Sequence, residues 1–125
     1  MEREHLEHEF ARKPAPQSVR LIDFERAEVH PGFLPETYIL IVSGTKPYVT
    51  MQVRLSPLVY VKQPEYWGIE VLGSLPGMGL PVLAPYTVSL PLGGIIGTIG
   101  IEVIGANKKK QIAILSKEVY AQTAD

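Results

Sequence analysis

One stretch of the chain limits its fold more than any other, because residues 71–101 carry no charged side chain. Glu70 and Glu102 border this stretch, and seven glycines and four prolines interrupt it. Proline lacks a backbone donor and glycine has an entropic cost inside a regular element, so one long helix is excluded. The stretch is long enough to span a membrane, but its broken pattern argues against a span. It predicts short buried strands joined by tight turns.

The composition places the chain among ordinary globular proteins. Its 125 residues indicate one domain, and 46% hydrophobic and 20% charged residues are typical of a soluble protein. A net charge of −1 and a pI near 6.3 give no field of one sign, so no nucleic-acid partner is expected. The absence of cysteine excludes disulfides, thiolate metal ligands and thiol nucleophiles.

The two ends of the chain differ from its middle. Residues 1–17 mix acidic and basic side chains and end in two prolines, which predicts a charged arm that is either a short helix or disordered. Residues 18–116 are expected to form a single β-sandwich domain, and residues 117–125 a polar tail. The division follows from the change to a period of two at Ser18 and from the polar composition after residue 116.

The charged arm also bears on location and on metal binding. A signal peptide would need an apolar run where the first ten residues are charged, so we expect a cytoplasmic protein if Met1 is the native start. His5 and His8 are three residues apart and would share one face of a helix. A third ligand and a rigid frame are missing, so we predict no metal site.

Strands are predicted throughout the middle of the chain. Residues 37–43 form a nearly continuous β-branched run, which predicts a central strand buried on both faces. Residues 49–56 alternate apolar and polar side chains, and we expect these two strands to form a hairpin. The other strands are expected at 19–29 with a bulge near Asp23, 58–61, 66–72, 86–92, 98–104 and 111–115.

Seven to eight short strands, with no convincing helix after residue 17, predict an all-β fold and an antiparallel β-sandwich. No connection is long enough for a crossover helix, which excludes a parallel α/β fold. Residues 85–90, Pro-Tyr-Thr-Val-Ser-Leu, resemble the tyrosine-corner strand of immunoglobulin and fibronectin type III domains. This resemblance implies an immunoglobulin/fibronectin-III-like sandwich in which the Tyr86 ring packs in the core and its hydroxyl bonds to nearby backbone.

The sequence predicts no catalytic residue and no cofactor. None of the serines stands in a Gly-x-Ser-x-Gly motif, and His30 is the one histidine between residues 18 and 116. Glu70 and Glu102 would form an acid–base pair if their strands faced each other across a cleft. Single carboxylates on strands more commonly mark a solvent face, so an enzyme that uses Glu70, Glu102 or His30 is the third functional hypothesis.

Apolar and aromatic residues near the turns predict a contact surface. Tyr66 and Trp67 are consecutive in a strand and point to opposite faces, so one is expected on the surface, as interface anchors are. The connections at 73–85 and 93–97 hold more apolar residues than a core of this size needs. The candidate site residues are Tyr66, Trp67, Met78, Leu80, Val82 and Leu83.

These features support two hypotheses ahead of the enzyme. The first is a non-catalytic β-sandwich module that acts by contact with a protein partner or with itself, for example as a homodimer. The second is a carrier of a small apolar ligand, in a pocket lined by the last four candidate residues.

Overall fold

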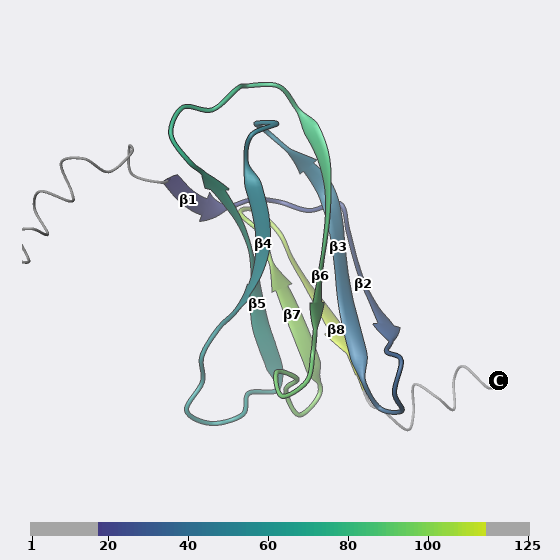
Figure 1. Ribbon diagram of the computed structural model, residues 1–125. Coiled ribbons are helices and arrows are strands. Elements are labelled where there is room, and N and C mark those ends of the chain that lie inside the picture. The colour runs from purple at the N-terminus through teal and green to yellow at the C-terminus, as the bar shows by residue number, and fades with distance from the viewer. Residues whose placement is uncertain (1–17, 115–125) are drawn as a thin grey trace, which may run out of the picture.

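The computed structural model of the protein describes residues 18–114. These residues form eight strands and no helix, arranged as two sheets that face each other (Figure 1). The predicted all-β fold is therefore confirmed, and the two layers are consistent with a β-sandwich. The predicted charged arm, with its two histidines, and the predicted polar tail lie outside the described residues. No helix within residues 18–114 is long and apolar enough to cross a bilayer.

The smaller sheet has the order β2-β3-β6. Its strands are β2 (Arg26–Pro31), β3 (Tyr38–Lys46) and β6 (Ala84–Pro91). The strands of the larger sheet are β1 (Ser18–Leu21), β4 (Gln52–Pro57), β5 (Tyr66–Leu75), β7 (Gly100–Ile104) and β8 (Lys109–Ala113). β5 is the centre of this sheet, with β4 on one side and β1 and β7 sharing the other, and β8 pairs with β7.

One strand pair runs parallel. β5 and β7 pair from Tyr66 opposite Gly100 to Glu70 opposite Ile104, whereas every other pair is antiparallel. The chain leaves β5, passes through β6 in the other sheet and returns to β7, so the connection needs no helix. The prediction of a wholly antiparallel sandwich is wrong at this pair.

The predicted hairpin between residues 37–43 and 49–56 is also wrong. β3 pairs with β2 and β6, while β4 pairs with β5, because the turn between β3 and β4 carries the chain from one sheet to the other. β3 is central as predicted, but only one of its faces is buried. Tyr38, Leu40 and Val42 are at most 5% exposed, whereas the side chains between them are half-buried.

Two further strand predictions need correction. The predicted strand at 19–29 is two strands in different sheets, and the expected bulge near Asp23 is the crossing between them. Ile22 and Phe24 point into the core on this crossing. The predicted strand at 58–61 is part of a loop, in which Val59 and Val61 are almost fully exposed. A run of four apolar residues after a proline did not distinguish a strand from a loop here.

The core lies between the two sheets and draws on every strand except β1 and β8. Its largest fully buried side chains are Leu40, Met51, Ile69, Leu92, Ile101, Val42, Val71 and Val103. Six of these eight residues follow the period of two in β3, β5 and β7, since alternate side chains of a strand point to the same face. The alternation of β5 therefore places its inner face, whereas the continuous apolar run of β3 did not show which of its faces is buried.

Tyr86 joins the smaller sheet to the crossing between β1 and β2. Its ring is 7% exposed, and its hydroxyl donates a hydrogen bond of 3.0 Å to the carbonyl oxygen of Asp23. Asp23 lies 63 residues away in the sequence. The ring packs in the core as the tyrosine-corner resemblance implied, but the partner of the hydroxyl is distant and not local.

The carboxylate of Asp23 fixes the turn between β7 and β8 to the same crossing. The backbone N–H of Asn107 donates to Oδ1 at 2.7 Å, and Asn107 Nδ2 donates to Oδ2 at 3.0 Å. These bonds stabilise the ionised form and lower the pKa of Asp23. The crossing, β6 and the β7–β8 turn are thus held together by one residue.

This arrangement predicts acid sensitivity. Because the pKa of Asp23 is lower in the folded than in the unfolded state, its contribution is present above about pH 4 and is lost as the pH falls further. We expect wild type to lose more stability than Asp23→Asn between pH 5 and pH 3 in urea denaturation. Glu65→Gln, at an exposed carboxylate, is the control and should follow wild type. Equal pH dependence in wild type and Asp23→Asn would contradict the prediction.

Candidate functional site: apolar surfaces at the two ends of the sandwich

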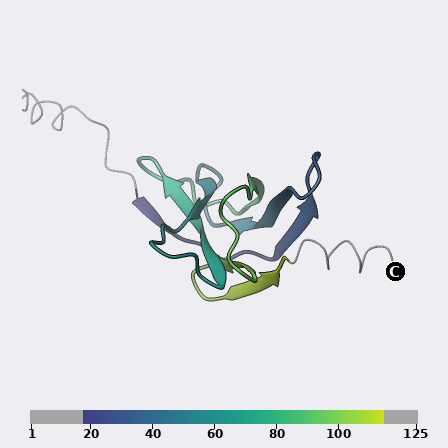
Figure 2. The same ribbon diagram turned by 90° about the horizontal axis from the view of Figure 1, so that it is seen from below.

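The loops of the sandwich alternate between its two ends. The β3–β4 turn and the β5–β6 loop lie at one end, which we call the tip and define as residues 47–50 and 76–83 (Figure 1). The β2–β3, β4–β5 and β6–β7 connections lie at the opposite end, which we call the base and define as residues 32–37, 58–65 and 92–99 (Figure 2). The strands run between these two ends.

Large apolar side chains within residues 18–114 are exposed at the ends of the sandwich and not on its flat faces. Nine of the ten lie in loops, and the tenth is on β1, opposite Ser74 near the tip. The ten are Val19, Phe33, Leu34, Val49, Val59, Val61, Met78, Leu80, Val82 and Leu83. Single exposed apolar residues need no explanation, whereas grouping of this kind is typical of contact surfaces.

The tip is the more uniform of the two apolar surfaces. Met78 is 89% exposed, Leu83 71%, Leu80 53%, Val82 51% and Val49 40%. No residue of the tip is charged. Four of the six predicted site residues therefore lie together on one exposed, uncharged surface.

Hydrogen bonds join the two segments of the tip into one unit. The N–H of Val49 donates to the carbonyl oxygen of Leu80 at 3.3 Å, and the N–H of Leu80 donates to Thr50 Oγ1 at 3.2 Å. The ring of Tyr48 packs so closely on Gly79 that a Cβ atom there would lie 2.5 Å from it. The exposed side chains are thus held on a frame rather than on a single free loop.

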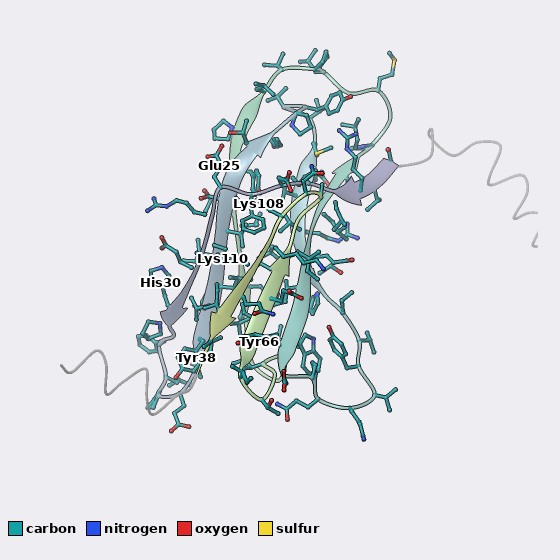
Figure 3. All side chains as sticks on the ribbon, turned by 180° about the vertical axis from the view of Figure 1, so that it is seen from behind. Glu25, His30, Tyr38, Tyr66, Lys108 and Lys110 are labelled. Carbon is teal, nitrogen blue, oxygen red and sulfur yellow. The ribbon has the colours of Figure 1, made fainter. Side chains whose placement is uncertain are left out.

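Tyr66 and Trp67 lie at the other end of the molecule. They begin β5, whereas the β5–β6 loop follows the tenth and last residue of that strand, about 30 Å away at the usual rise per residue. Figure 3 shows Tyr66 at the base with Tyr38, far from Glu25 near the tip. The six predicted residues therefore belong to two surfaces.

Trp67 supports the base from inside. It is half-buried against the core, and its indole N–H donates to the carbonyl oxygen of Leu58 at 2.9 Å. The ring of Tyr60 meets the Trp67 ring edge to face, with 5.1 Å between the centroids. These contacts hold the start of the β4–β5 loop, and Tyr66 beside it is also half-buried. Neither aromatic residue is a fully exposed anchor.

The most exposed apolar side chains of the base were not predicted as site residues. Phe33 is 100% exposed, Val61 105%, Val59 94% and Leu34 62%. The strand predicted at 58–61 concealed two of them, and the sequence pattern gave no reason to single out the Phe33 side chain. A bulky aromatic residue directly after Pro-Gly was the available signal.

The β2–β3 connection that carries Phe33 is closely bonded. The N–H of Gly32 donates to the carbonyl oxygen of Thr37 at 2.6 Å. The N–H and the hydroxyl of Thr37 both donate to the carbonyl oxygen of Leu34. Glu36 completes the turn with a positive φ of 59°. Phe33 is therefore presented by a defined turn.

The residues of the enzymatic hypothesis do not form one site, because His30 is on β2 in the smaller sheet and both glutamates are in the larger sheet. β5 and β7 do pair, but Glu70 lies opposite Ile104 and Glu102 opposite Gly68. Their neighbours in sequence point into the core, so both carboxylates are on the outer face of the larger sheet and do not face across a cleft. His30 Nε2 lies 3.0 Å from Glu28 Oε1, and both side chains are about half-exposed. Among the described residues, no group of three or more potential ligands could hold a metal ion.

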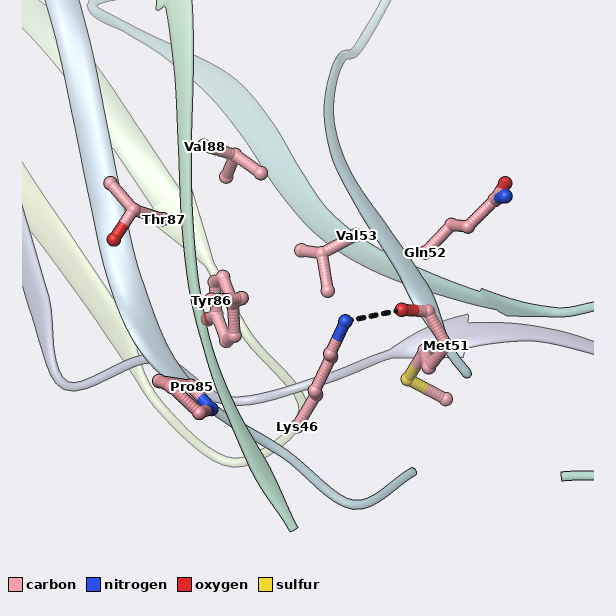
Figure 4. A pocket seen from close by; sticks show the side chains of 8 residues that line it. All are labelled: Lys46, Met51, Gln52, Val53, Pro85, Tyr86, Thr87 and Val88. Carbon is pink, nitrogen blue, oxygen red and sulfur yellow. Dashed lines mark hydrogen bonds between the residues drawn. The ribbon is translucent and has the colours of Figure 1, made fainter. Parts of the chain in front are cut away.

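A cavity of about 380 Å³ opens at the side of the sandwich, between the edges of β4 and β6. Tyr86, Val53 and Val88 line it, and Lys46 reaches across one end to donate a 2.8 Å bond to the carbonyl oxygen of Met51 (Figure 4). No tip residue lines this cavity. It is a side opening of the core and is separate from the apolar ends.

Comparison with known proteins adds no functional information. No protein-family model, curated protein or solved structure matches the chain. The chemistry and geometry of the described residues therefore carry the functional argument.

Proposed function

We propose that this protein is a non-catalytic β-sandwich module that acts through protein–protein contact, with the tip as its contact surface. The main observation behind this proposal is that four large apolar side chains of one eight-residue loop, residues 76–83, are each at least 51% exposed on an uncharged surface. Surfaces of this kind on globular proteins are typical of sites that become covered in a complex.

The energy available at the tip indicates what partner it needs. Its five exposed apolar side chains are equivalent to about three fully exposed ones, and burying them is worth about 5–9 kcal/mol. Association costs about 4–15 kcal/mol in lost freedom of motion. The tip alone is thus marginal, and a stable contact needs a partner that contributes apolar surface of its own. A second copy of this chain meets that requirement.

The exposure of the tip also bears on the carrier hypothesis. A small-molecule pocket encloses most of the surface of its ligand, and so its lining side chains are largely buried. Met78 and Leu83, which were predicted to line such a pocket, are 89% and 71% exposed. This supports a contact surface over an enclosed pocket.

The proposal predicts that charge at the tip prevents association. We expect the molar mass of the wild-type protein in light scattering to rise with concentration above 13.8 kDa. Met78→Glu/Leu83→Glu should bind at least tenfold more weakly, because each unpaired carboxylate would have to leave water at the contact. Both side chains are exposed, so the fold should be unaffected.

The matched control adds two carboxylates to the flat faces. Thr87→Glu/Gln111→Glu places one on the outer face of each sheet, at exposed positions, and should associate like wild type. A wild-type protein that stays monomeric at every concentration, and gains thermal stability with an added fatty acid, would contradict the proposal and favour the carrier.

A further inference from the structure

We infer that copies of this chain associate head to tail, with the tip of one copy against the base of the next. The inference rests on the proposed contact function, and it adds the identity of the partner and a second surface. It follows from three observations: both ends are apolar, the edges of the sheets are protected, and the two ends differ in charge.

The base is the second apolar surface and needs a cover of its own. Phe33, Val59 and Val61 are each at least 94% exposed, so the base displays at least as much apolar surface as the tip. A symmetric dimer through two tips would leave both bases exposed to water. In a row of copies, contact between the tip of one copy and the base of the next is the single type of contact that covers both apolar surfaces of every copy except the two at the ends.

Prolines protect the open edge of β6 against pairing with another strand. The N–H of Leu92 donates to the carbonyl oxygen of Tyr38 at 2.9 Å, in register with the β3–β6 pair. Because backbone groups of an antiparallel pair alternate in direction, the odd-numbered residues of β6 turn theirs outward. Pro85 and Pro91 are two of these residues and have no N–H to donate.

Lysines protect other open edges. Lys110 on β8 donates through Nζ to the carbonyl oxygen of Ala27 on β2, the opposite edge, at 2.9 Å. Lys46, the last residue of β3, donates through Nζ to the carbonyl oxygen of Met51, just before the edge strand β4, at 2.8 Å (Figure 4). Charged side chains and prolines at the edge of a sheet discourage the addition of a further strand. The sides of the sandwich are thus unsuited to self-contact, and the two ends are left.

The charges permit contact between unlike ends. The tip has none, whereas the base carries Glu36, Lys62 and Glu65 in its loops. A tip against a base brings no like charges together, and the charged residues can stay at the rim, where water reaches them. Two bases against each other would bring together two surfaces that each carry two carboxylates and one ammonium group, a net charge of −1.

The positions of the two ends determine the form of the assembly. The tip and the base lie at opposite ends of the strands (Figure 1). A contact between different surfaces repeats from copy to copy, and with the surfaces at opposite ends it extends along one axis instead of closing as a dimer. We therefore expect wild type to form a ladder of species that lengthens with concentration.

Complementation between two variants tests this inference. The tip variant is Met78→Glu/Leu83→Glu, and the base variant is Phe33→Glu/Val61→Glu, at side chains that are 100% and 105% exposed. In sedimentation velocity on the full chain, each variant alone should be monomeric. An equimolar mixture should form a dimer of twice 13.8 kDa and no larger species, with a dissociation constant within about threefold of one wild-type contact. The corresponding serine variants repeat the test without added charge, and circular dichroism checks the fold of each.

Each alternative outcome has a different meaning. A base variant that still dimerises by itself would show that tips pair with tips, which overturns head-to-tail contact and leaves the proposed function intact. Two monomeric variants whose mixture stays monomeric would also overturn the inference. A wild-type protein that is monomeric at every concentration would contradict the proposed self-contact as well.

Discussion

Replacing Gly100 by alanine is expected to destabilise the fold by about 3 kcal/mol or more. Gly100 begins β7, where the chain is buried between β5 and β8. The new Cβ atom would overlap the carbonyl oxygen of Ile112 and lie 2.8 Å from the Cα atom of Ala113. Both atoms belong to the backbone of β8, so no side-chain rotation can relieve the clash, and the two strands must move apart.

Two other glycines provide matched controls. At Gly93 no atom lies within 4 Å of an added Cβ, so Gly93→Ala should be neutral or stabilise the fold by about 0.4–1 kcal/mol. Gly94 has the same free space but a φ of 79°, so Gly94→Ala should cost about 1–2 kcal/mol through the backbone alone. Urea denaturation of the three variants separates steric overlap from backbone strain. A smaller loss for Gly100→Ala than for Gly94→Ala would show that β8 relaxes freely.

Removing the side chain of Tyr86 is the substitution with the next largest expected effect. Tyr86→Ala should cost about 3–5 kcal/mol, because it deletes a buried aromatic ring from the core between the sheets. Tyr86→Phe keeps the ring and removes only the 3.0 Å bond to the carbonyl oxygen of Asp23. We expect it to cost about 1–2 kcal/mol, since the carbonyl group loses its partner. Equal losses in the two variants would mean that the hydroxyl, and not ring packing, dominates.

Alkaline pH offers an independent test of the burial of the same hydroxyl group. Burial, followed by the nearby charges of Glu25 and Asp23, raises the pKa of Tyr86 to about 12. The unfolded chain ionises this hydroxyl near its ordinary value of about 10, so the contribution is complete below pH 10 and is lost as the pH rises toward 12. Wild type should therefore lose more stability than Tyr86→Phe over this range. Tyr66→Phe, at a half-buried tyrosine, is the control and should retain the wild-type slope.

Part of the candidate site could be predicted from the sequence. The uncharged run with its glycines and prolines predicted an apolar connection at 73–85, and four of the predicted residues lie together in its central part, residues 76–83. The sequence could not show that Tyr66 and Trp67 are at the far end of β5. It also did not single out Phe33, because exposure depends on which neighbouring elements cover a turn, and hydrophobicity alone does not supply that information.

The sequence by itself determined the local features of this protein. Alternation of side chains in β5 and β7 determined which of their faces are buried, because the direction of successive side chains is a property of each strand alone. Proline marks where five strands end, because β2, β4 and β6 each end at a proline and β3 and β5 end just before one. Only the tertiary structure decided which strands pair, that β5 and β7 run parallel, and that the apolar loops gather at two opposite ends. Those features depend on contacts between residues far apart in the chain. The same local pattern is compatible with several strand pairings.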